Sequence, residues 1–213
     1  MAPTAITQPP LLSSKSADLA PPLQDRSMVV EQLTEVACDV IGQAIDLLEN
    51  TLTDDHQLVY QSKYIPGSTI GKHLRHARDH YILLAQSVLD AASTESLSNI
   101  RAPANLSYDA RIRDTPMETS ITAAVQAFRD TTKLLEDISK HVPQDLPVVL
   151  TADTGPYQQV LSSTFGRELW FGSLHAIHHW SMVRVIAGEL GCELSANFGV
   201  APSTINYRSK AKI

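Results

Sequence analysis

The amino-acid sequence predicts an all-α fold, a four-helix bundle with one small β-hairpin before the last long helix. Only 9 of the 213 residues are glycine, and 6% are aromatic. Long stretches lack proline, and within them apolar residues recur every three or four positions, which is the spacing of one helix face. Four such segments, the first at 27–52 and the last at 163–190, favour a bundle whose core can hold a metal or cofactor site.

The N-terminal residues 1–26 are predicted to form a disordered tail. Proline recurs there among Ser, Thr, Ala and Gln, with no sustained apolar period. A transit peptide is the alternative, but the tail contains acidic residues and no arginine before Arg26. The folded domain is therefore expected to span residues 27–213, beginning with a helix over 27–52.

The second helix is expected to begin after Pro66-Gly67 and to continue to about Ala92. Ser68 is placed to cap it by accepting a hydrogen bond from a free backbone N–H. Residues 93–114 are polar and irregular, and we expect a loop there.

The third helix has the clearest start signal in the chain. Thr115 fits the N-cap, Pro116 fits the first turn where no N–H is needed, and Glu118 fits the reciprocal capping position. Apolar residues at helical spacing then extend this helix to about His141.

The segment before the last helix is short, apolar and rich in valine. A hairpin is predicted from 146–150 and 158–161, joined by a turn. The last helix is expected to run from about Ser163 to Leu190, with Gly191 placed to end it. Residues 192–213 are expected to be irregular and to lie against the bundle.

The overall charge and the cysteine content limit the kinds of protein that this chain can be. The net charge of −6 argues against a nucleic-acid partner, which would favour a basic surface. Cys38 and Cys192 form no C-x-x-C motif, and Cys38 is expected to be a buried, inert thiol. No apolar run reaches membrane-spanning length and no secretory signal is visible. A cytoplasmic protein without a membrane partner is predicted.

Six of the eight histidines fall in two helical segments, 71–80 and 168–179. Helix residues four apart have neighbouring side chains, so His175 and His179 can share one metal ion. His178 is about 100° around the helix from His179 and cannot easily join both. A metalloprotease of the H-E-x-x-H type is excluded because Ala176 occupies the glutamate position.

The other segment offers candidates for a third ligand. His73, His76 and His80 fall within about 60° of one another on their helix. A bundle would bring the two segments together and complete a three-histidine site. The alternative is a bundle without metal, in which the histidines hydrogen-bond to one another.

Two further residues are candidates for a catalytic role. Glu168 is two helical turns before His175, where it could orient a ligand, bind metal-bound water or act as a general base. A buried structural partner for an arginine is the alternative. Arg111, with Arg113, could bind an anionic substrate group through paired hydrogen bonds. These arginines could instead pair with acidic neighbours and pin the long loop.

Several of these segments resemble the DinB/YfiT-like family of metalloenzymes, and the resemblance covers roughly residues 28–207. The matching segments are 68–71 leading to His76, 108–114 ahead of Glu118, 175–179 and 198–204. The resemblance implies a four-helix bundle, often dimeric, that holds zinc or nickel on His76, His175 and His179. His73 and His80 match no ligand of the general family, so their roles stay open.

The resulting functional hypothesis is a metal-dependent enzyme with open coordination positions. Such a metal can lower the pKa of a bound water, as in a hydrolase, or activate a thiol. Relatives in the family include S-transferases that depend on low-molecular-weight thiols, which favours transfer and a small-molecule partner. The alternative is a non-catalytic metal-binding or dimerising helical bundle, in which His73, His80 or Glu168 would close the metal shell.

Overall fold

The computed structural model describes residues 26–92, 96–110, 112–113 and 115–210. The tail predicted over residues 1–26 thus lies outside the described residues, except for Arg26, which begins the first helix. The helices are α1 (Arg26–Asp46), η1 (Leu47–Thr51), α2 (His56–Val59), α3 (Ile70–Ala91), η2 (Leu97–Asn99), η3 (Pro116–Glu118), α4 (Ile121–Ser139), α5 (Phe165–Glu189) and α6 (Pro202–Lys210). The strands are β1 (Ala104–Leu106), β2 (Pro147–Asp153) and β3 (Gln158–Thr164).

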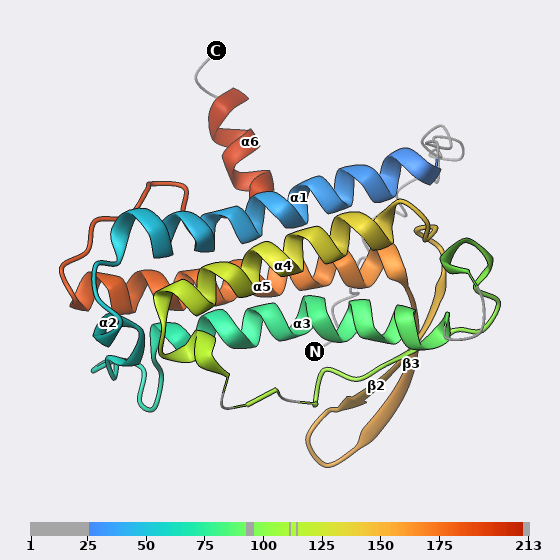
Figure 1. Cartoon of the computed structure of the whole chain (residues 1–213), viewed down its shortest axis with the longest axis horizontal. Helices are drawn as coiled ribbons and strands as arrows, with labels where there is room; N and C mark the ends of the chain where they lie inside the picture. Colours follow the sequence, from blue (N-terminus) through green and yellow to red (C-terminus); the bar gives the residue numbers. More distant parts are fainter. Residues whose placement is uncertain (1–25, 93–95, 111, 114, 211–213) are drawn as a thin grey trace, which may run out of the picture.

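Four long helices make up the body of the molecule (Figure 1). Both α3 and α1 pack against α5, and both also pack against α4. The apolar stripes predicted from the sequence line the interior between them. At the centre, Trp180 is fully buried and its indole N–H donates to the Val40 carbonyl oxygen of α1 at 2.9 Å. None of the helices within the described residues is long and apolar enough to cross a membrane.

The prediction of an all-α fold is wrong, because a three-stranded mixed sheet accompanies the helices. β2 and β3 pair antiparallel where the valine-rich hairpin was expected, and both strands are longer than predicted. β1 pairs parallel with β2, Ala104 opposite Val148, and gives the order β1-β2-β3. β1 has three residues, too few to show an alternating pattern, and its partner is distant in the sequence. The chain is therefore not a pure four-helix bundle.

Three helix starts differ from the predictions by one to five residues. Thr69, rather than Ser68, caps α3 by accepting from the Lys72 N–H. The turn expected to open the third helix is a separate 3-10 helix, η3, and α4 begins after Ser120. Thr164 caps α5, which leaves Ser163 in β3. In each case the residue with extended backbone and a hydroxyl within reach of the first turn is the cap.

At the C-terminal end of α5 one prediction is confirmed, and for the segment that follows it one prediction is wrong. Gly191 has a positive φ of 74° and follows the end of α5, as predicted. The segment after it is not wholly irregular, because residues 202–210 form α6, which projects away from the bundle (Figure 1). No residue of α6 is buried, so this helix contributes little to the core.

A close backbone contact joins η3 to the start of α3. A Cβ atom built on Gly71 would lie 2.1 Å from the Glu118 carbonyl oxygen. Arg75, one turn further along α3, donates to both Glu118 and Asp79. Glycine at position 71 lets the two backbones touch, and Arg75 adds charged hydrogen bonds to the same junction.

Candidate metal site

Three histidines meet between α3 and α5, the two helices that the predicted site required. His76 comes from α3, and His175 and His179 come from α5, one helical turn apart. One ring nitrogen from each lies within 4.8 Å of the others. His179 is buried, whereas His76 and His175 are half-buried. The arrangement therefore gathers three metal-binding nitrogens at one point that solvent can partly reach.

Two of these histidines, His175 and His179, have ring nitrogens at a separation suited to one ion. His175 Nε2 and His179 Nε2 are 3.0 Å apart. Two nitrogens at about 2.0–2.1 Å from one zinc would then subtend about 94° at the ion, and a tetrahedral angle would need about 3.4 Å. The pair fits two adjacent positions around one ion with little movement. Three imidazoles leave at least one position for a further ligand.

Two more histidines surround the three. His73 lies with its Nδ1 2.8 Å from His179 Nδ1. His80 donates through Nδ1 to the His76 carbonyl oxygen at 3.1 Å, because a carbonyl can only accept. The His80 ring stacks on His175, with the ring centroids 3.8 Å apart. His73 and His80 thus hold the rings of the candidate ligands in place.

Burial keeps four of the clustered histidines, His73, His80, His175 and His179, uncharged at neutral pH. It lowers the pKa of His179 to about 2 and that of His175 to about 3, and repulsion between neighbouring imidazoles adds to both shifts. It also lowers the pKa of His73 and His80 to about 4. Neutral imidazole is the form that binds a metal ion. Protons therefore do not compete for these nitrogens near pH 7.

Glu168 lies beside the cluster, in a contact that the sequence did not reveal. Its side chain is 3% exposed and accepts from the Tyr108 hydroxyl at 3.0 Å and from the Ser163 hydroxyl. Arg167 is 3.7 Å away. Tyr108 in turn stacks on His80, and burial followed by the Glu168 charge raises the pKa of Tyr108. Glu168 thus connects Ser163 of β3 with Tyr108, which in turn contacts His80. The role of Glu168 as a general base stays a prediction.

The remaining predicted residues lie in different surroundings. Arg111 lies outside the described residues. Glu118, an acidic residue that follows this loop, binds Arg75 of α3. His178 is exposed on α5, on the side predicted from the helical arithmetic. Tyr108 and Ser163 were not predicted, since no local pattern relates them to Glu168.

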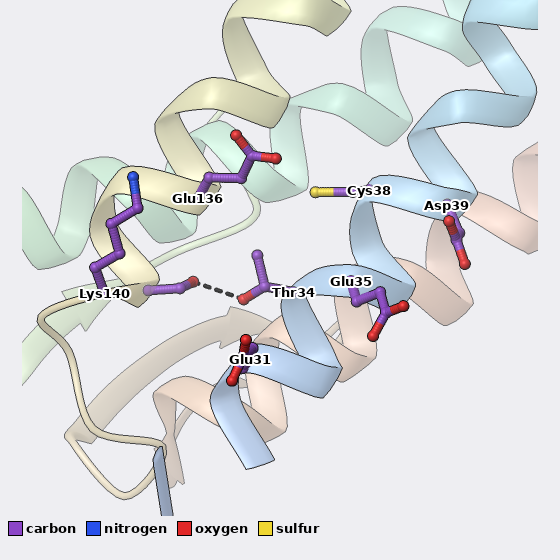
Figure 2. Close-up of a pocket in the computed structure, with 8 residues that line it drawn as sticks. Glu31, Thr34, Glu35, Cys38, Asp39, Glu136 and Lys140 are labelled. Carbon is purple, nitrogen blue, oxygen red and sulfur yellow. Dashed lines mark hydrogen bonds between the residues drawn. The ribbon is translucent and has the colours of Figure 1, made fainter. Parts of the chain in front are cut away.

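A separate groove lies between α1 and α4, away from the histidines (Figure 2). It encloses about 780 Å³ and is lined by Glu31, Thr34, Glu35, Cys38, Asp39, Glu136, Ser139 and Lys140. Burial, with nearby acidic groups, raises the pKa of the Cys38 thiol to about 11. The thiol is therefore protonated at neutral pH and is a poor nucleophile, although Cys38 is only partly buried and not buried as predicted.

Comparison with known proteins gives one informative relative. The chain is 34% identical over 179 residues to FK506-binding protein 5 of Rhizopus delemar. The match covers 83% of this chain but 38% of the relative, so the chain spans less than half of the relative's length. No protein-family model matches the chain, and no solved structure matches it.

These findings overturn the family assignment made from the motifs. The relative carries the name of an FK506-binding protein, and no DinB/YfiT-like model matches. The thiol-dependent transferase or hydrolase activity, which was predicted with that family, is corrected on the same ground. The motifs gave a wrong family because each is only a few residues long, and histidines at helical spacing are not specific to one family. The predicted homodimer and small-molecule partner stay predictions.

Proposed function

We propose that this chain binds one divalent metal ion, zinc or nickel, with His76, His175 and His179 as ligands. The observation that carries the proposal is the meeting of three imidazole nitrogens within 4.8 Å of one another. Burial keeps at least two of these rings neutral, as a metal requires. An ion held there would join α3 to α5 and so stabilise the interface between these two helices.

Metal analysis of the untagged chain tests this proposal. After removal of metal with a chelator, the chain is expected to take up about one zinc or nickel ion, measured by mass spectrometry and titration calorimetry. His175→Ala, which removes one of three ligands, is expected to weaken binding at least about 100-fold. Because a bound ion stabilises only the folded state, zinc should raise the unfolding temperature of the unmodified chain but not of this variant.

His178→Ala is the matched control, since His178 is exposed on the same helix beside the candidate ligands. It is expected to bind zinc as tightly as the unmodified chain. Metal content far below one ion per chain would contradict the proposal. Equal losses in His178→Ala and His175→Ala would mean that zinc binds to surface histidines in general.

FK506 binding is a second candidate function, supported by the 34% identity to an FK506-binding protein. More than half of that relative lies outside the match, so its binding activity could lie elsewhere in it. Titration of FK506 into the isolated chain, followed by calorimetry, is expected to show saturable binding if the matched region carries the activity. The absence of a heat signal up to the solubility limit would assign the activity to the rest of the relative and leave the metal proposal unaffected.

A further inference from the structure

Three of the clustered rings form a continuous hydrogen-bonded series. His175 Nε2 faces His179 Nε2 at 3.0 Å, and His179 Nδ1 faces His73 Nδ1 at 2.8 Å. A neutral imidazole carries one proton, on one of its two nitrogens. The protons of the series can therefore be arranged in two ways. Either His179 donates to His73 and accepts from His175, or it donates to His175 and accepts from His73.

A metal ion bound by both Nε2 atoms replaces the hydrogen bond between His175 and His179, and of the two proton positions on His179 only Nδ1 is compatible with it. To bind through Nε2, His179 must present a lone pair there, and its proton must reside on Nδ1. That N–H then needs an acceptor, since His179 is only 8% exposed. Metal-binding histidines commonly donate their second nitrogen to such a partner, which fixes both the tautomer and the ring orientation. The nitrogen in position to accept is His73 Nδ1.

A second observation concerns the other nitrogen of His73. His73 Nε2 is buried and has no hydrogen-bond partner within the described part of the chain. A buried polar atom without a partner is destabilising, so a stabilising structural role does not explain this histidine. Its Nδ1 contact with His179 is the interaction that an apolar residue of the same size would lack.

We propose that His73 is a positioning residue, whose Nδ1 accepts the His179 Nδ1–H and holds His179 in the tautomer that binds metal. This inference rests on the proposed metal site and assigns a role to a histidine that the sequence left open. His73 does not contact the ion itself. It acts through the hydrogen bond, which orients the imidazole and increases its basicity as a ligand.

Two substitutions at position 73 separate an acceptor from a space-filling side chain. In His73→Asn the amide oxygen can occupy the place of Nδ1 and accept the same hydrogen bond. In His73→Leu the volume is largely kept and the acceptor is lost. Zinc affinity, measured by competition with a chelating dye, is expected to fall about 10- to 100-fold in His73→Leu and to stay within about threefold in His73→Asn.

Stability of the zinc-free proteins provides the control. His73→Leu removes the unpartnered Nε2, so its unfolding temperature without zinc is expected to stay within a few degrees of the unmodified chain. Reduced zinc affinity in a stable, folded variant is the signature of a positioning role. Equal loss of affinity in the Leu and Asn variants, or unchanged affinity in His73→Leu, would overturn the inference.

Nitrogen-15 NMR of the histidine side chains gives a readout that does not depend on metal uptake. In the zinc-free chain the shared proton is expected on His179 Nδ1, with a coupling across the hydrogen bond to His73 Nδ1. A proton on His73 Nδ1 instead would refute the inference. If the unmodified chain bound no zinc, the proposed function would fail, while this measurement would still decide which histidine is the donor.

Discussion

Gly71→Ala is expected to lower the free energy of unfolding by about 3 kcal/mol, as measured by urea denaturation. The added methyl group would lie 2.1 Å from the Glu118 carbonyl oxygen and 2.8 Å from its carbon. These are backbone atoms of η3, so no side-chain rotation can relieve the overlap. Either η3 or the first turn of α3 has to move, and the hydrogen bond from Arg75 of α3 to Glu118 of η3 resists that movement.

Gly42→Ala is the matched control, because Gly42 also lies inside a helix but has no atom within 4 Å of an added Cβ. Alanine is the better helix former, so this variant is expected to gain about 0.5–1 kcal/mol. The opposite signs at the two glycines would separate helix propensity from steric contact. A stabilised Gly71→Ala would show that η3 does not lie against α3 as described.

Arg75→Met is expected to lower the free energy of unfolding by about 3 kcal/mol at pH 7.5, because it removes the ion-pair partner of the buried Asp79 carboxylate. The Asp79 side chain is 2% exposed, and its Oδ2 is 2.9 Å from Arg75 Nη1. Burial raises the pKa of Asp79 above its usual range even though Arg75 opposes the shift. Arg75 contributes the largest effect that lowers the pKa of Asp79, and the substitution removes this effect.

The destabilisation in Arg75→Met should depend on pH, with a sign set by that raised pKa. Between the ordinary pKa of an unfolded aspartate and the raised pKa of Asp79, the folded state binds a proton that the unfolded state does not. Stability therefore falls as pH rises through this window. Urea denaturation at pH 5 and pH 7.5 is expected to show the smaller loss at pH 5.

Two further variants complete this test. Arg129→Met removes an exposed ion pair with Glu49, and is expected to change stability by less than about 1 kcal/mol at either pH. Adding Asp79→Asn to Arg75→Met removes the buried charge and should recover part of the loss. An equal effect of Arg75→Met and Arg129→Met would contradict a special role for the buried pair.

The sequence determined those features that depend on neighbours along the chain. Apolar spacing predicted four long helices, and the hydroxyl, proline and glycine signals placed their ends within a few residues. His175 and His179 could be paired because four residues along any α-helix return to the same face. The same geometry places His178 about 100° around the helix from His179. These inferences need no knowledge of what lies across the bundle.

Only the tertiary structure decided which distant groups meet. β1 becomes a strand because β2 offers it hydrogen bonds, so three residues without a pattern turned a predicted all-α fold into a mixed one. The hydrogen bonds of Tyr108 and Ser163 to Glu168, and the contact between His73 and His179, join residues 5 to 106 positions apart. Burial then keeps the imidazoles of His73, His80, His175 and His179 neutral, which composition cannot reveal. Spacing along one helix thus indicated which histidines could pair, whereas packing between helices decided which nitrogens face one another and what protonation state they hold.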